Sequence, residues 1–172
     1  MTTHAARALG HRARIYVPEI AGASKIGLIR RLGADLCVVP GAYGEALEQA
    51  QAYEAATGAM QIHAYDAPTT VAGQGTCMAE WEDQGLDADT VLIAVGGGGL
   101  IAGALGWLDG RRKVIGVEPE TACALRAAQL AGKPVNVDVS GVAANALGAR
   151  RIGQICFDLA RDIPVVTVSD DQ

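Results

Sequence analysis

The apolar run Thr90-Val-Leu-Ile-Ala-Val95 is followed directly by Gly96-Gly97-Gly98-Gly99 and then by Leu100-Ile101. The apolar and β-branched residues predict a buried strand, the glycines predict a tight loop, and the residues after them predict the start of a helix. Because glycine has no Cβ atom, successive backbone N–H groups can converge on one point. The positive end of the helix dipole adds to that field. The stretch therefore predicts a cradle for a phosphate group.

Strands and helices alternate along the rest of the chain. We expect strands at 14–17, 35–39, 60–64, 90–95, 113–117 and 164–168. We expect helices at 2–9, from a cap at Ser24 to a stop at Gly33, at 45–56, about 75–84, from Leu100 onward, about 121–131 and 143–161. Short loops between such elements are typical of βαβ units. The predicted fold class is α/β, with parallel sheets and helices on both faces in three αβα layers.

Composition bounds the class of protein. The chain has 172 residues, of which 50% are hydrophobic, 19% charged and 4% aromatic, and its formal net charge is −5. The apolar share is enough for a core, which excludes a disordered chain. The acidic balance and the few aromatic residues argue against a nucleic-acid partner. Apolar runs are too short to predict a membrane span, and the first residues lack a secretory signal, so we expect a cytoplasmic protein.

The cysteines do not suggest a metal or redox site. Cys37, Cys77, Cys123 and Cys156 are far apart in the sequence, and no pair has the short spacing of metal ligands or of a redox motif. We expect them to be buried small hydrophobic residues in a reducing compartment.

The glycine loop is compatible with two kinds of phosphate-containing ligand. Gly97, Gly99 and Ala102 fit a relaxed dinucleotide-binding pattern, and Glu118 follows Gly99 by 19 residues, where an acid would bind a ribose. This predicts an NAD-binding domain. The loop alone also suits a non-catalytic module that binds a phosphorylated small molecule.

Several further motifs occur in collinear order and together resemble one family. They are Ile15-Tyr-Val-Pro-Glu19, Ser24-Lys25-Ile26, Ile29-Arg-Arg-Leu-Gly-Ala34, Val71-Ala-Gly-Gln-Gly-Thr76, Val114-Ile-Gly-Val-Glu-Pro119, Ser140-Gly-Val-Ala143 and Leu147-Gly-Ala-Arg-Arg-Ile-Gly153. With the glycine loop, they resemble the fold-type II (tryptophan synthase β-like) pyridoxal-phosphate enzymes, in the serine/threonine dehydratase branch. The likeness covers nearly the whole chain, as a central fragment without the family's N-terminal lysine segment and C-terminal segment.

The resemblance implies a site and an activity. Gly96, Gly97, Gly98, Gly99 and the amide of Leu100 would bind the phosphate of pyridoxal 5′-phosphate, and Gly141 and Val142 would lie near its ring. The implied reaction is elimination of water from L-serine or L-threonine to give a 2-oxo acid and ammonia, with racemase activity as a related possibility. The implied partners are a small amino-acid substrate and a second copy of the chain in a homo-oligomer.

The resemblance also predicts what this chain does not supply. The chemistry needs a lysine that holds the cofactor as a Schiff base, and Lys25, Lys113 and Lys133 all lack the family's sequence context for it. We therefore expect no catalytic residue here, an incomplete cofactor site and no activity from this chain alone.

A metal site is not expected either. Some members bind a divalent cation through a glutamate, a carbonyl and an acid, and the matching positions here are Glu118, Ala122 and Ala124. Because Ala124 has no side-chain oxygen, we predict no metal. By the same resemblance, residues 1–66 form part of a small domain and residues 67–172 part of a large, phosphate-binding domain.

Overall fold

The structure is a computed structural model that describes residues 2–41 and 43–171, without the side chain of Asn145. The chain divides after Ile62 into two compact units, unit 1 (Met1–Ile62) and unit 2 (His63–Gln172). Both units contain parallel strands connected by helices, so the predicted α/β class with parallel sheets is confirmed.

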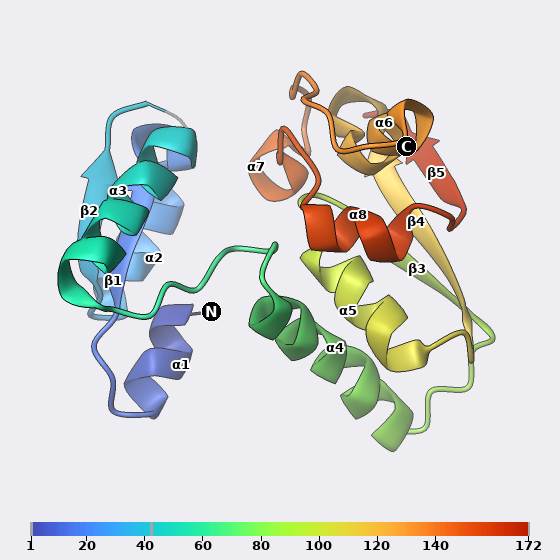
Figure 1. Cartoon of the computed structure of the whole chain (residues 1–172), viewed down its shortest axis with the longest axis horizontal. Helices are drawn as coiled ribbons and strands as arrows, with labels where there is room; N and C mark the ends of the chain where they lie inside the picture. Colours follow the sequence, from blue (N-terminus) through green and yellow to red (C-terminus); the bar gives the residue numbers. More distant parts are fainter. Residues whose placement is uncertain (1, 42, 172) are drawn as a thin grey trace. The chain divides into compact units, whose positions relative to one another are not determined.

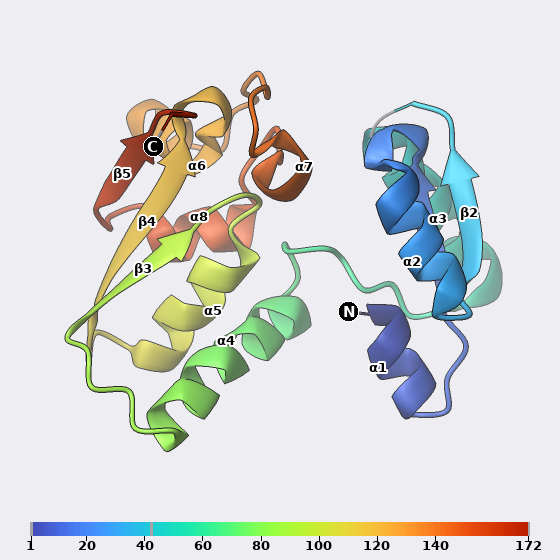
Figure 2. The same cartoon turned by 180° about the vertical axis from the view of Figure 1, so that it is seen from behind.

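Unit 1 is small and has three layers, with helices on both faces of a two-stranded sheet. Its elements are α1 (Thr2–Ala8), β1 (Arg14–Pro18), a 3₁₀ turn (Glu19–Ala21), α2 (Ala23–Arg31), β2 (Asp35–Val39) and α3 (Tyr43–Thr57). The strands β1 and β2 pair in parallel, and α2 and α3 lie on opposite faces of the pair (Figures 1 and 2).

The first residues of the two strands form the main polar contact of unit 1. Arg14 lies opposite Asp35 in the register, and its Nε donates a hydrogen bond of 2.7 Å to the Asp35 carboxylate. The guanidinium also stacks over the ring of Tyr53 in α3, at 4.4 Å from the ring centroid. The strand pair is thereby tied to the helix that covers it.

Unit 2 carries the glycine loop. Its elements are α4 (Pro68–Asp83), β3 (Thr90–Ala94), α5 (Gly99–Leu108), β4 (Lys113–Pro119), a 3₁₀ turn (Glu120–Ala122), α6 (Ala124–Ala131), α7 (Ala144–Leu147), α8 (Gln154–Ala160) and β5 (Val165–Val168). The parallel sheet has the order β3-β4-β5. Because all strands run the same way, the loop after β3 lies at the carboxyl edge of the sheet.

The core of unit 2 lies on one face of this sheet. Val91, Ile93 and Val114 point to that face and are buried against α5, with α8 and α6 completing the cluster. The helices lie on this side of the strands in both views (Figures 1 and 2). In the described residues, unit 2 therefore has two layers, whereas unit 1 has three.

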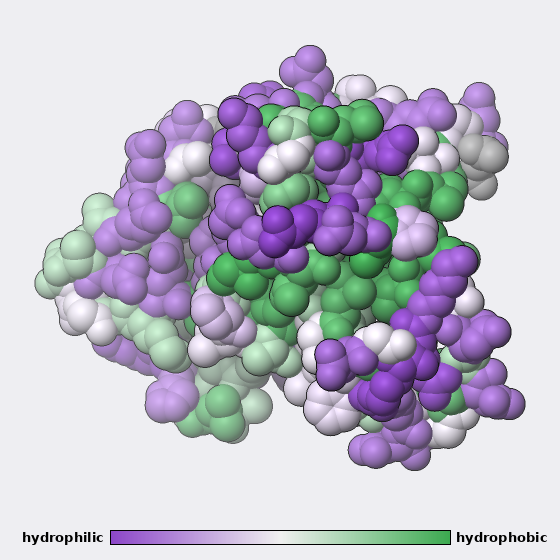
Figure 3. All heavy atoms as spheres, turned by 45° about the vertical axis from the view of Figure 1, so that its right-hand side comes forward, coloured by the Kyte–Doolittle hydropathy of each residue, from purple (hydrophilic) through white to green (hydrophobic). Residues whose placement is uncertain are grey.

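The opposite face of the sheet is apolar and largely uncovered among the described residues. Leu92 is 66% exposed and Val166 is 49% exposed, and both point away from the helices. Apolar residues also gather in a band on the side of unit 2 seen in Figure 3. No described helix of either unit is both long and apolar enough to cross a membrane.

Helices α4 and α5 approach closely because both have a glycine at the crossing. A Cβ atom on Gly103 would lie 2.5 Å from the amide nitrogen of Gly75, and one on Gly75 would lie 2.9 Å from the carbonyl oxygen of Gly103. The two backbones therefore touch without intervening side chains. This contact fixes α5, which begins at the glycine loop.

Three predicted elements differ from those in the structure. No strand forms at 60–64, where Met60 is 84% exposed and no strand among the described residues pairs with it. Helix α4 begins at Pro68, well before residue 75, because proline is tolerated in the first helical turn. Helix α2 begins at Ala23 with Gly22 as its N-cap, so Ser24 lies inside the helix and does not cap it.

The long helix predicted over 143–161 is broken in the structure. It forms only the short α7 and α8, with an irregular segment from Gly148 to Gly153 between them. A Cβ atom on Gly153 would lie 2.6 Å from the Asp66 carboxyl carbon, so this residue lies against another part of the chain. Tertiary contacts at the break replace the helical hydrogen bonds that the sequence pattern predicts.

Candidate functional site

The glycine loop leads from β3 directly into α5. Gly98 is the N-cap of α5, with a left-handed φ of 92° that favours glycine, and its carbonyl accepts a hydrogen bond of 2.9 Å from Ala102 N–H. The N–H groups of Gly98, Gly99 and Leu100 precede this first helical bond and have no partner within the helix. No described residue outside the helix accepts a hydrogen bond from them. The loop therefore presents a row of backbone donors.

The side of the glycine loop that faces the interior of unit 2 is closely packed. A Cβ atom on Gly97 would overlap the ring of Tyr65, and one on Gly98 would lie 2.6 Å from Ile152 Cδ1 and 2.7 Å from Cys156 Cβ. One on Gly96 would lie 3.1 Å from the backbone of α7. The glycines are therefore needed for packing on this side.

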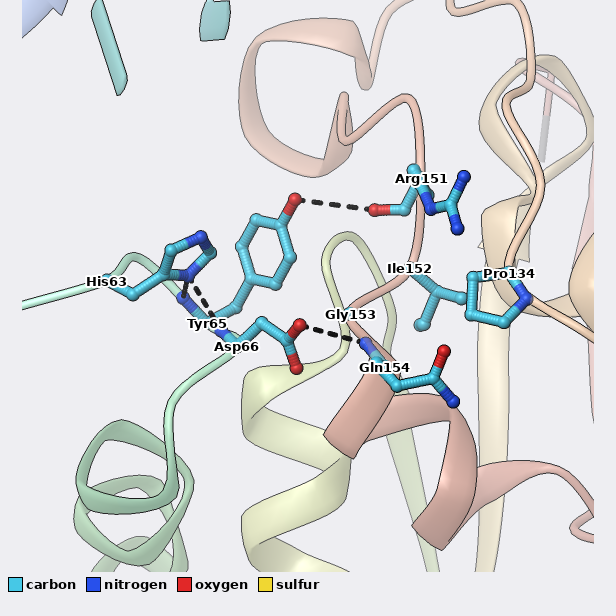
Figure 4. Close-up of a pocket in the computed structure, with 8 residues that line it drawn as sticks. All are labelled: His63, Tyr65, Asp66, Pro134, Arg151, Ile152, Gly153 and Gln154. Carbon is cyan, nitrogen blue, oxygen red and sulfur yellow. Dashed lines mark hydrogen bonds between the residues drawn. The ribbon is translucent and has the colours of Figure 1, made fainter. Parts of the chain in front are cut away.

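Asp66 connects the chain's entry into unit 2 with helix α8. Its carboxylate accepts a hydrogen bond of 2.9 Å from the N–H of Gln154 (Figure 4) and another of 2.9 Å from the N–H of Ile155. These are the first two N–H groups of α8, which have no partner within the helix. Just before them, Gly153 N–H donates a hydrogen bond of 3.1 Å to the carbonyl of Gly97. Nothing in the local sequence marks Asp66 as the cap of a helix so far along the chain.

A cavity of about 300 Å³ lies beside this connection. It is lined by His63, Tyr65, Asp66, Pro134, Arg151, Ile152, Gly153 and Gln154 (Figure 4). The lining residues include no glycine of the 96–99 loop. This cavity and the row of backbone donors are therefore different places.

The predicted ring neighbours Gly141 and Val142 also lie at the carboxyl edge of the sheet. Gly141 has φ 80°, and a Cβ atom there would overlap the carboxylate of Asp170, which follows β5. The Asp170 carboxylate accepts a hydrogen bond of 3.3 Å from Val142 N–H. Ser140 N–H donates to the carbonyl of Thr121, after β4. Residues that follow the two neighbouring strands therefore hold this segment.

Glu118 is buried, with an exposed fraction of 0%. Its two carboxylate oxygens accept hydrogen bonds of 2.7 Å from Leu125 N–H and 2.8 Å from Arg126 N–H, at the start of α6. Burial raises the pKa of this carboxyl, and the two backbone hydrogen bonds partly offset the rise. The NAD interpretation needs this carboxylate for a ribose, but here it caps a helix inside the protein.

Glu118 and Ala124 are also two of the positions at which some family members would bind a divalent cation. Both Glu118 oxygens face backbone N–H groups, and Ala124 has an apolar side chain in the first turn of α6. Within residues 2–41 and 43–171, no three His, Cys, Asp or Glu side chains form a group that could hold a metal ion.

The three candidate lysines lie in different places. Lys113 begins β4 opposite Thr90, so it lies at the amino edge of the sheet, whereas the glycine loop lies at the carboxyl edge. Lys133 is exposed in the turn after α6, and Lys25 lies in α2 of unit 1. None of the three belongs to the carboxyl edge of the sheet beside the glycine loop in unit 2.

The glycine loop fits the phosphate of a cofactor. Its donors are uncharged backbone groups at the start of a helix, which is a common anion-binding arrangement. A side chain at Gly97 or Gly98 would collide with the residues packed behind the loop, and one at Gly96 or Gly99 would be in tight contact with them. What the described residues do not provide at this edge is a lysine for covalent attachment.

Comparisons with known proteins agree with this arrangement. The family model described as pyridoxal-phosphate dependent enzyme matches residues 1–172. An L-threonine ammonia-lyase of Thermotoga maritima is 33% identical over 160 residues, which cover 91% of this chain and 40% of that protein.

Solved structures show the same fold. Threonine deaminase isoform 2 of Solanum lycopersicum superposes with a TM-score of 0.86 at 29% identity, over 98% of this chain and 51% of that one. Maize serine racemase has a TM-score of 0.89 at 26% identity and is covered to 53%. The chain thus spans about half of these proteins or less. It belongs to the fold-type II family of pyridoxal-phosphate-dependent enzymes.

Proposed function

We propose that this chain holds the phosphate of pyridoxal 5′-phosphate on the backbone N–H groups of Gly96 to Gly99 and Leu100. The observation that carries the proposal is the row of N–H donors at the start of α5 that no described residue uses. The helix dipole adds to their attraction for a dianion. By this proposal, Gly141 and Val142 lie beside the cofactor ring, held by Asp170.

We infer that the reaction served is an elimination on a small hydroxyamino acid such as L-serine or L-threonine. The relatives named as threonine ammonia-lyase and threonine deaminase support it. The cofactor supplies an electron sink for the α-carbanion when it is bound. The residues of this chain bind and orient its phosphate and exclude water from the buried side of the loop. Racemisation of the same class of substrate is the second candidate, supported by the likeness to serine racemase.

Phosphate binding is tested with a pair of variants at one position. Leu100→Pro removes one N–H donor in the first helical turn, where proline is tolerated, and Leu100→Ala keeps the donor but shortens a side chain that is 39% exposed. Titration with pyridoxal phosphate, followed by fluorescence, should give weaker binding for Leu100→Pro and near-unchanged binding for Leu100→Ala. Equal binding by both variants would contradict a role for this amide.

Covalent attachment and turnover are tested separately. Borohydride reduction and peptide mapping should find no cofactor on Lys25, Lys113 or Lys133, and 2-oxo acid formation from L-serine or L-threonine should be absent with this chain alone. A cofactor trapped on one of these lysines would make that residue the catalytic lysine. A chain that binds no pyridoxal phosphate at all would overturn the proposed function.

A further inference from the structure

The segment that enters unit 2, His63–Asp66, contacts the glycine loop both directly and through α8. The ring of Tyr65 occupies the space that a side chain on Gly97 would need. A Cβ atom on Gly99 would lie 3.0 Å from the Cβ of Tyr65. The carboxylate of Asp66 caps α8, which begins directly after Gly153. Gly153 in turn donates to the carbonyl of Gly97.

We propose that Asp66 is a positioning residue for the phosphate loop, acting through α8 and the Gly153 N–H to hold the peptide between Gly97 and Gly98 in its binding orientation. This inference rests on the proposed function, because it concerns how the same donors are aimed. Asp66 itself touches neither the loop donors nor, by this proposal, the cofactor.

The planarity of the peptide bond explains how a contact behind the loop aims a donor in front of it. In a trans peptide the C=O and the following N–H point in opposite directions. The carbonyl of Gly97 points to Gly153, at 3.1 Å between O and N. The N–H of Gly98 therefore points away from Gly153, toward the open side of the loop. Losing the Gly153 contact would free this peptide to rotate, which glycines on both sides permit.

The backbone that carries Asp66 is itself held in place. His63 Nδ1 accepts hydrogen bonds of 2.9 Å from the N–H of Asp66 and of 3.3 Å from the N–H of Tyr65 (Figure 4). The Tyr65 hydroxyl also donates to the carbonyl of Arg151, at 3.4 Å. These bonds fix the backbone at Tyr65 and Asp66 and tie it to Arg151, two residues before Gly153. From this backbone the Asp66 carboxylate caps α8, and so sets the position of Gly153.

The experiment compares Asp66 with a matched carboxylate elsewhere in unit 2. Glu118 also accepts two backbone hydrogen bonds at a helix start, but the helix is α6, and among the described residues no backbone hydrogen bond joins α6 to the glycine loop. Asp66→Ala should raise the dissociation constants for inorganic phosphate and for pyridoxal phosphate by up to about tenfold, the scale of a lost helix cap. Asp66→Asn, which keeps one carbonyl acceptor, should recover part of the affinity. Glu118→Gln should leave both dissociation constants essentially unchanged.

Urea unfolding of each variant identifies conditions under which all are folded, so that lost affinity is not lost structure. Amide hydrogen exchange then reports the connection itself, whether or not phosphate binds. Asp66→Ala should speed exchange at Gly153, and Glu118→Gln should not. If a folded Asp66→Ala protein keeps the unchanged dissociation constants or the unchanged Gly153 exchange rate, Asp66 does not position the loop. If the unchanged protein binds neither probe, the proposed function fails, while the exchange rate at Gly153 still decides whether the connection exists.

Discussion

The carboxylate of Glu118, at the end of β4, accepts a hydrogen bond of 2.7 Å from the backbone N–H of Leu125, in the first turn of α6. The second oxygen accepts from the next N–H, and the side chain has no exposed surface. A residue whose position in the sequence suggests ligand binding is thus used to begin a helix. Its burial raises the pKa of the carboxyl, with a consequence for stability that can be measured.

The free energy of unfolding should depend on pH through Glu118. Because burial raises the pKa in the folded chain above its ordinary value of 4.5, the folded state holds the proton more tightly than the unfolded state. The contribution to stability is therefore fully present below pH 4.5 and is lost as pH rises through the raised value. Glu118→Gln should remove this part of the dependence in urea unfolding measured across that range. Glu120→Gln controls for the loss of one exposed charge, and a Glu118→Gln profile parallel to the unchanged one would refute the effect.

The α4–α5 crossing should tolerate no side chain at its centre. Gly103→Ala places a methyl group 2.5 Å from the amide nitrogen of Gly75, so the helices must separate. We expect a loss of about 1–3 kcal/mol in the free energy of unfolding. Gly106→Ala, on the same helix but with nothing within 4 Å of the new Cβ, should be neutral or gain up to about 1 kcal/mol. Equal effects of the two substitutions would show that the helices do not touch there.

The cysteines should differ sharply in reactivity. Cys156 is buried against Gly98, and burial, with a smaller effect of Asp66, raises the pKa of its thiol to about 12. Cys77 is exposed on α4 and Cys37 and Cys123 are half-buried, so the expectation that all four cysteines are buried is wrong. Iodoacetamide should therefore alkylate Cys77 in the folded protein and leave Cys156 unmodified until urea unfolds the chain. Alkylation of both at one rate under folding conditions would place Cys156 outside the core.

The sequence predicts the strand, glycine loop and helix at residues 90–101 because every local signal there agrees. The apolar strand, the glycines and the following helix each match the structure, with β3 ending at Ala94 and α5 beginning at Gly99. Asp66 gave no comparable signal. Its hydrogen bonds go to Gln154 and Ile155, almost ninety residues along the chain. Contacts over such separations have no signature in local spacing.

The prediction of one continuous helix over 143–161 is wrong for a related reason. The spacing of its apolar residues suits a continuous helix, but Gly148 and Gly153 interrupt it and the segment between them packs on other parts of unit 2. Ile152 in that segment is 1% exposed and lies behind Gly98. Tertiary packing at the loop outweighed helix propensity there.

The contact between Tyr65 and Gly97 should appear as a coupling energy. Gly97→Ala alone places a methyl group in the Tyr65 ring and should destabilise the protein by about 1–3 kcal/mol. Tyr65→Ala alone removes a large, partly buried ring and should also destabilise it. In the double variant the new methyl group enters space that the ring has left, so the total loss should be smaller than the sum of the two by more than about 0.5 kcal/mol. Urea unfolding of the four proteins measures this, and strictly additive losses would mean that the ring does not pack against Gly97.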